Sequence, residues 1–237
     1  MSANIKQNLE LIRNRINEAE KKSGRTAGSV KLMAVSKFHP SEAVEQAVAC
    51  GQFLFGENRV QEAAEKFPPL CSRFPEIELQ MIGQLQTNKV KKAVQIADCI
   101  QSVDRIELLQ EIEKQCAKLD RTIKILFEVH TGEESKSGYT SEADLRASIE
   151  ECIKGTFAHI TPCGFMTMAP FTDDEILIRK SFITLRELSQ KLQNDYSTLS
   201  LKELSMGMSG DFEIAIEEGS TLVRVGTAIF GERDYSK

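Results

Sequence analysis

The chain has 237 residues, of which 41% are hydrophobic and 27% are charged, and its formal net charge at pH 7 is -5. This length and composition provide a packed core for one large domain or two small ones. The acidic balance, without long runs of like charge, argues against nucleic acid or an anionic membrane as the main partner. The sequence contains no membrane-spanning or signal segment and no CxxC pair among its six cysteines, so we expect a reduced cytoplasmic protein without a metal site.

Apolar residues at helical spacing near the start of the chain, Ile5, Leu9, Ile12, Ile16 and Ala19, predict an N-terminal helix. Eight β-rich runs then alternate with helical patterns. The predicted strands are Val30–Lys37, Phe53–Asn58, Ile77–Gly83, Cys99–Asp104, Thr122–His130, Ala158–Met168, Leu199–Met206 and Leu222–Phe230. The predicted helices between them include Glu42–Cys50, Asn88–Ile96, Arg105–Leu119, Ser141–Ile153, Asp173–Gln193 and Asp211–Glu218.

Eight such units in an α/β chain favour a (β/α)8 barrel, and a doubly wound open sheet is the alternative. No linker or sequence repeat interrupts the pattern, so we expect one domain over residues 1–237. Barrel chemistry takes place at the C-terminal ends of the strands. The residues that follow each predicted strand are therefore the first candidates for a site.

Two glycine-containing turns near the C-terminus indicate a phosphate site. In the first, Gly207 and Gly210 allow close approach of an anion, and Ser209 occupies the N-cap position expected before Asp211–Glu218. In the second, Gly226 and Thr227 supply a further N–H group and a hydroxyl. The last two strands of such barrels commonly hold phosphate, so the pair predicts a phosphorylated ligand.

Lys37 ends the first predicted strand, where Met33, Val35 and Lys37 share one face. A lysine partly desolvated in a barrel mouth favours its neutral amine and therefore Schiff-base chemistry with a carbonyl compound. The competing interpretation is that Lys37 is simply the first solvated residue of a loop. The first and last strands are neighbours in a closed barrel, which places Lys37 near the second turn.

Arg224 and Gly226 lie two residues apart on the last predicted strand, a spacing of about 6.6 Å in extended chain. This is close to the distance between the phosphate and the ring nitrogen of pyridoxal 5'-phosphate. Together with Lys37 and the phosphate turns, Arg224 therefore indicates a site for this cofactor. The alternative is a structural Arg224 paired with a carboxylate such as Glu203 or Glu232.

Several segments of the chain together resemble the YggS/PROSC family of pyridoxal phosphate homeostasis proteins. The resemblance is carried by Met33-Ala-Val-Ser-Lys37, Phe55-Gly-Glu-Asn58, Val60-Gln-Glu62, Ile82-Gly83, Glu133-Glu-Ser-Lys-Ser-Gly138, Gly164-Phe-Met-Thr-Met168, Leu204-Ser-Met-Gly-Met-Ser209 and Arg224-Val-Gly-Thr227. It implies a fold-type III barrel that holds pyridoxal phosphate as a Schiff base on Lys37. It further implies that Ser209, Gly226 and Thr227 bind the phosphate, with Met208, Arg224 and Asn58 beside the cofactor.

Gln84, where many family members have histidine, and Arg59, where tyrosine is common, depart from the family pattern. Neither departure affects Lys37 or the phosphate turns. The loop around Lys136 follows the fifth predicted strand, which places it near the mouth, although a solvated loop is the simpler interpretation. The histidines are scattered and are expected to be structural.

Barrel enzymes that use this cofactor, such as alanine racemase, carry a second domain, and this chain ends seven residues after its last predicted strand. A cation at the pyridine nitrogen also weakens the ring as an electron sink. We therefore expect a non-catalytic monomeric carrier that stores pyridoxal phosphate and delivers it to apo-enzymes. The alternatives are a small amino-acid racemase, with Tyr139 or Tyr235 as the second base, and a phosphosugar barrel enzyme.

Overall fold

Eight parallel strands close into a barrel in the computed structural model, which describes residues 4–132 and 137–232. The strands pair in sequence order, and β8 returns to pair with β1, so the doubly wound alternative is wrong. Their bounds are β1 Lys31–Val35, β2 Leu54–Glu57, β3 Glu78–Met81, β4 Cys99–Val103, β5 Ile123–Glu128, β6 Ile160–Met166, β7 Glu203–Ser205 and β8 Leu222–Val225. Each lies inside its predicted range, and the polar ends of those ranges belong to loops.

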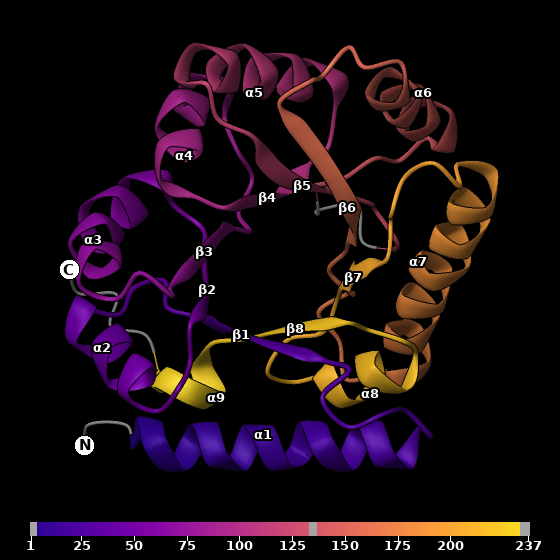
Figure 1. Ribbon diagram of the computed structural model, residues 1–237. Coiled ribbons are helices and arrows are strands. Elements are labelled where there is room, and N and C mark those ends of the chain that lie inside the picture. Colours follow the sequence, from indigo (N-terminus) through magenta and orange to yellow (C-terminus); the bar gives the residue numbers. More distant parts are fainter. Residues whose placement is uncertain (1–3, 133–136, 233–237) are drawn as a thin grey trace.

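Helices surround the barrel and cover its outer face (Figure 1). Their bounds are α1 Ile5–Lys22, α2 Ser41–Ala49, α3 Val60–Arg73, α4 Val90–Ile96 after the 3-10 turn η1 Thr87–Lys89, α5 Ile106–Leu119, α6 Glu142–Ile153, α7 Glu175–Asp195, α8 Phe212–Glu217 and α9 Thr227–Phe230. The predicted N-terminal helix is confirmed as α1. It lies beside α8 and α9, with Leu9, Ile12 and Ile16 buried.

Two helical segments, α3 and α9, were not named among the predicted helices. Helix α3 contains Pro68 and Pro69, and prolines remove backbone donors inside a helix, so its pattern is not easily recognised. The last strand was predicted to run to Phe230, but β8 ends at Val225 and Thr227–Phe230 forms α9. A short buried apolar run does not distinguish a strand from a helical turn by periodicity, which explains this error.

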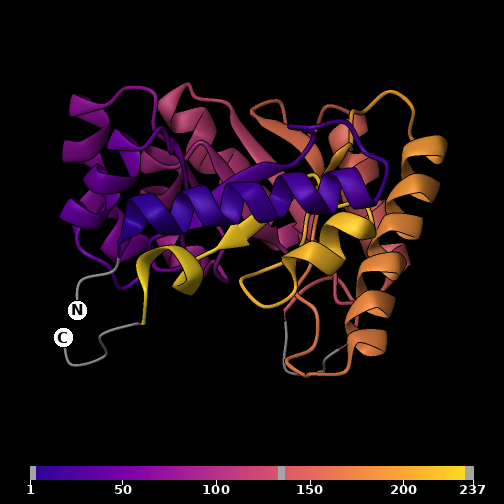
Figure 2. The same cartoon turned by 90° about the horizontal axis from the view of Figure 1, so that it is seen from below.

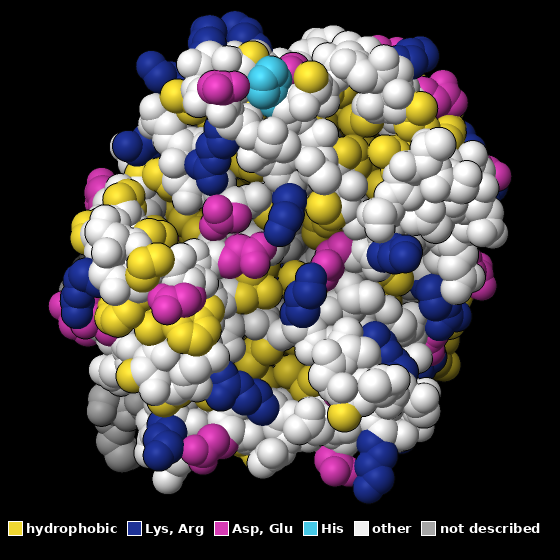
Figure 3. All heavy atoms as spheres, viewed as in Figure 1, with side chains coloured by type: hydrophobic (Ala, Val, Ile, Leu, Met, Phe, Trp, Pro, Cys, Tyr) yellow, Lys and Arg dark blue, Asp and Glu magenta, His cyan; other side chains and the backbone are white. Residues whose placement is uncertain are grey.

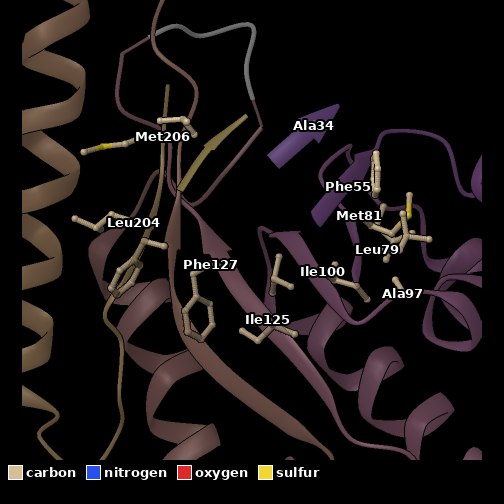
Figure 4. Packing of buried hydrophobic residues seen from close by; sticks show 14 of the residues in the cluster. Ala34, Phe55, Leu79, Met81, Ala97, Ile100, Ile125, Phe127, Leu204 and Met206 are labelled. Atoms are coloured by element: carbon tan, nitrogen blue, oxygen red, sulfur yellow. The ribbon is translucent and has the colours of Figure 1, made fainter. Parts of the chain in front are cut away.

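The main apolar core lies between the strands and the helices. It includes Ala34, Phe55, Leu79, Ile100 and Phe127, one from each of the first five strands (Figure 4). Side chains alternate along each strand, so the intervening residues face the barrel interior. Two small apolar clusters lie there, one around Met33, Val35 and Leu222 and the other around Cys99, Leu126 and Met166.

The loops that follow β7 and β8 lie toward one end of the barrel, at the lower side of Figure 2. On the face seen in Figure 3, acidic and basic side chains are interspersed and neither forms a large patch. Within the described ranges, no helix combines the length and apolar composition that a membrane span requires. All six cysteines are free thiols.

Candidate functional site

Lys37 lies just beyond the C-terminal end of β1, which stops at Val35. Met33 and Val35 belong to the interior cluster, and Lys37 follows them in the turn beyond the strand. Lys37 is half-buried. The next residue, Phe38, has a φ of 66°, in the left-handed region that non-glycine residues rarely occupy. The lysine therefore projects from a tight turn rather than from the strand itself.

The second glycine turn lies directly against the end of β1. Strand β8 pairs with β1, with Ala34 opposite Val225. A Cβ atom on Gly226 would lie 3.2 Å from the carbonyl oxygen of Val35, which shows how closely the two backbones approach. The rings of His39 and Phe230 lie 5.2 Å apart, so the Lys37 turn also packs on α9.

The first glycine turn meets the second through a hydrogen bond. The amide of Ala228 donates to Ser209 Oγ over 3.5 Å, which joins residues 19 positions apart. The predicted N-cap role of Ser209 is wrong, because Asp211 is the N-cap residue of α8. Asp211 Oδ1 accepts from the amide of Met208, so the carboxylate stabilises the turn from within and Ser209 is left at its rim.

The two turns present several donors with no protein acceptor. In residues 4–132 and 137–232, the amides of Ser209, Gly210 and Thr227 donate to no other group, and neither do the hydroxyls of Ser209 and Thr227. Backbone N–H groups that converge from neighbouring turns form a site for an anion. We call these residues, 207–210 with 226 and 227, the phosphate cradle.

Arg224 is buried in the barrel interior, where its side chain makes two hydrogen bonds, one to β7 and one to the residue that follows β6. Its Nη1 donates to Ser205 Oγ at 2.7 Å and its Nη2 to the Thr167 carbonyl at 2.8 Å. Burial lowers the pKa of Arg224 to about 10, so the guanidinium remains charged at pH 7. The alternative pairing with Glu203 is wrong, since Glu203 binds Lys31 at the other end of the barrel.

A chain of hydrogen bonds continues from Arg224 across the barrel, and sequence reasoning missed it. Ser205 Oγ donates to Gln101 Oε1 at 2.7 Å, and Gln101 Nε2 donates to Gln80 Oε1 at 2.5 Å. Gln80 Nε2 then donates to Glu78 Oε1 at 2.8 Å. Each hydrogen bond is donated in the direction that leads from the guanidinium to the Glu78 carboxylate. Hydrogen bonds aligned in this way strengthen one another. Polar residues at alternate positions of buried strands were the available signal.

Asn58 and Met208 lie in the loops that follow β2 and β7. Asn58 follows β2, and its backbone packs so closely on Gly83 that a Cβ there would lie 2.4 Å from the Asn58 carbonyl oxygen. Met208 is 36% exposed beside Ser209.

Another residue of the barrel interior, Glu128 at the end of β5, was not anticipated. Its Oε1 accepts from Ser137 Oγ, and burial raises the pKa of its carboxyl group.

The tyrosine proposed as a second base does not face the mouth. Tyr139 is buried, its hydroxyl is hydrogen-bonded with Ser148 at 2.8 Å, and its ring packs against Phe127 in the outer core. Burial raises the pKa of its hydroxyl, which makes it a poor base at neutral pH. Tyr235 and Lys136 lie outside the described residues. Within those residues, no group of three His, Cys, Asp or Glu side chains could hold a metal.

Comparison with known proteins places the whole barrel in one sequence family. The family model described as "Alanine racemase, N-terminal domain" matches residues 3–234. A pyridoxal phosphate homeostasis protein of Aquifex aeolicus is 38% identical over 232 residues, which cover 98% of this chain and 100% of the relative. One of Mus musculus is 38% identical over 219 residues, covering 87% and 78%.

Solved structures with the same fold include a member of this group and an alanine racemase. PipY of Synechococcus elongatus, determined with PLP bound, has a TM-score of 0.80 and 36% identity, covering 91% of this chain and 100% of its own. An alanine racemase of Clostridium difficile has a TM-score of 0.75 and 16% identity, covering 97% of this chain and 56% of the racemase. The likeness to the racemase concerns the fold alone.

Proposed function

The chain belongs to the family of pyridoxal phosphate homeostasis proteins, and from this membership we propose that it binds, stores and delivers pyridoxal 5'-phosphate. The observation that carries the proposal is the proximity of three features. A lysine turn, a cradle of unpaired donors and a buried guanidinium converge at the end of β1, β7 and β8. Few ligands other than a phosphorylated aldehyde with an aromatic nitrogen would use all three.

Each residue then has a distinct part in holding the ligand. Ser209, Gly226 and Thr227 donate to the phosphate, where charge-assisted hydrogen bonds are strong. Lys37 would supply the amine, whose condensation with an aldehyde forms a C=N bond and releases one water. Arg224 would lie beside the ring nitrogen, and Met208 and Asn58 would border the ring. The five donors of the cradle without a protein acceptor are the feature of this chain that best fits a phosphate.

We further propose that the protein is a carrier without substantial catalysis. Arg224 remains a cation at pH 7, and a permanent cation beside the pyridine nitrogen disfavours its protonation. An unprotonated ring is a weaker electron sink for carbanion chemistry. Tyr139 is turned into the outer core, so among the described residues it is no partner for Lys37 in a two-base racemisation. These features favour retention of the cofactor over turnover.

The test of delivery is a transfer experiment. Holo-protein mixed with an apo-enzyme should restore its activity faster than cofactor leaves the holo-protein in the presence of a scavenger of free pyridoxal phosphate. The same preparation should show no substantial racemase, decarboxylase or transaminase turnover. Recovery no faster than scavenged release would contradict direct delivery. Sustained interconversion of L- and D-amino acids at enzymic rates would support the racemase alternative instead.

The phosphate cradle makes a separate prediction. Ser209→Ala and Thr227→Ala should each weaken cofactor retention by about 1.5–3 kcal/mol, the scale of a hydrogen bond to a charged group. Equilibrium titration with pyridoxal phosphate measures the loss. Ser72→Ala serves as a control, because its hydroxyl only donates to the Pro68 carbonyl on the exposed side of α3. Unchanged affinity in both cradle variants would show that the phosphate binds elsewhere.

A further inference from the structure

A buried ionic cluster lies behind the turn that carries Lys37. It consists of Glu57 at the end of β2 with Glu62 and Lys66 of α3, and we call it the Lys66 cluster. Lys66 Nζ donates to Glu57 Oε1 at 2.8 Å and to Glu62 Oε1 at 2.9 Å. The side chains of Lys66 and Glu57 are 7% and 0% exposed. Charged groups are rarely buried to this extent, so the cluster calls for an explanation.

The cluster contacts the two residues that flank Lys37. Ser36 Oγ donates to Glu57 Oε1 at 2.7 Å, and Lys66 Nζ donates to the Ser36 carbonyl at 2.9 Å. The amide of Phe38 donates to Glu62 Oε1 at 2.7 Å. Three polar groups of the turn, the hydroxyl and carbonyl of Ser36 before the lysine and the amide of Phe38 after it, are therefore hydrogen-bonded to the Lys66 cluster.

These contacts lie on the outer side of the turn. Glu57 and Ser36 alternate with the interior-facing Gly56 and Val35, so they point toward α3. Because Ser36 and Phe38 are bonded on the outer side, we expect the side chain of Lys37 between them to point toward the mouth. Arg59 also packs on the turn, since its guanidinium lies 5.1 Å from the centre of the Phe38 ring. Arg59, one of the departures from the family pattern, thus supports the left-handed residue beside the lysine.

Stability by itself is a weak reason for this arrangement. Well-packed apolar residues often stabilise a protein as much as a buried ion pair does, because the pair must be desolvated. Burial raises the pKa of Glu57, and its Oε2 has no hydrogen-bond partner, so the contacts of Oε1 with Lys66 and Ser36 offset only part of the desolvation. What apolar residues would not provide is a fixed direction for the backbone on both sides of Lys37.

We propose that Lys66 is a positioning residue, which acts through Ser36 directly and through Glu62 and Phe38 to hold the Lys37 amine toward the phosphate cradle. This inference rests on the proposed function. A reacting amine must lie within a narrow range of distance and angle of the aldehyde, and small displacements slow such reactions greatly. The Lys66 cluster should therefore affect formation of the covalent bond and leave phosphate binding almost unchanged.

The test compares two ligands with the Lys66→Met variant. Pyridoxal 5'-phosphate reports the rate of covalent bond formation by its absorbance, and 4-deoxypyridoxine 5'-phosphate, which lacks the aldehyde, reports binding to the cradle. We expect the covalent rate to fall about tenfold or more, with the affinity of the analogue within about twofold of the unmodified protein. Lys114→Met is the matched control, since Lys114 forms an exposed pair with Glu111 on α5.

Glu62→Leu provides a second route to the same turn. It removes the acceptor for the Phe38 amide while its own side chain is 24% exposed, so it serves where Lys66→Met fails to fold. Covalent rates equal to that of the unmodified protein in the folded variants would overturn the inference. Parallel losses of covalent rate and analogue affinity would also overturn it, because they indicate a general structural role. Failure of the unmodified protein itself to bond the aldehyde would instead contradict the proposed function.

Discussion

Replacement of Lys37 by alanine should abolish the covalent attachment of pyridoxal phosphate while the barrel remains folded. The change removes the amine, and the shortened side chain belongs to a half-buried turn at the mouth rather than to the core. The phosphate cradle is untouched, so weak non-covalent binding should persist. Mass spectrometry after borohydride reduction measures the result: the unmodified protein should carry one reduced cofactor at Lys37 and the variant none.

Lys31→Ala is the matched control for this experiment. Lys31 belongs to the same strand, but it lies at the opposite end, where it is largely exposed and pairs with Glu203 at 2.7 Å. The Lys31→Ala variant should be labelled at Lys37 as fully as the unmodified protein. If Lys37→Ala were labelled without reduction in yield, another lysine would be the point of attachment, and the assignment of the mouth would have to change.

Replacement of Gly207 by alanine should destabilise the protein by about 3 kcal/mol. This figure is the sum of the cost of a left-handed backbone at a non-glycine residue and the cost of overpacking. Gly207 has a φ of 96°, and a Cβ atom there would lie 2.6 Å from the Ala215 Cβ and 2.9 Å from the Phe212 Cα. The first turn would have to move away from α8. Urea unfolding monitored by circular dichroism measures the loss of stability, and a cofactor titration should show weaker binding as well.

Gly210→Ala separates backbone strain from general effects of substitution in the same turn. Gly210 has no left-handed φ, and a Cβ atom at this position meets nothing within 4 Å. The free energy of unfolding of the Gly210→Ala variant should differ from that of the unmodified protein by about 0.5 kcal/mol or less, as for most surface positions. Equal stability of the two variants would show that the turn accommodates a side chain at Gly207, contrary to the contacts described above.

The sequence predicted the order and type of most elements because their patterns are local. Alternation of apolar residues marks a strand, helical spacing marks α1, and glycines mark the turns that follow β7 and β8. The errors occurred where local patterns are ambiguous. The segment from Leu222 to Phe230 is mostly apolar on both sides of Gly226, where the backbone, with φ of -113° and ψ of -82°, leaves the strand and starts α9.

The candidate site was predicted in its parts but not in its contacts. Lys37, Ser209 and Thr227 were identifiable because each follows a strand, and barrel sites are built from such positions. The N-cap role expected for Ser209 was wrong because Asp211 is closer to the start of α8 and bonds the turn internally. Which donors remain unpaired depends on every neighbouring group, and a local pattern does not contain that information.

By itself, the sequence determined the (β/α)8 architecture, the strand ends that carry polar residues and the chemistry those residues offer. The tertiary structure decided which of them meet. The bond between Ala228 and Ser209, the chain from Arg224 to Glu78 and the contact of the Lys66 cluster with Ser36 all join separate segments of the sequence. The physical reason is that strand stagger and bulges, such as the register shift between Ile100 and Val103, set which side chains share a level of the barrel. Local periodicity gives the face on which a side chain lies, and only closure of the sheet gives its partners.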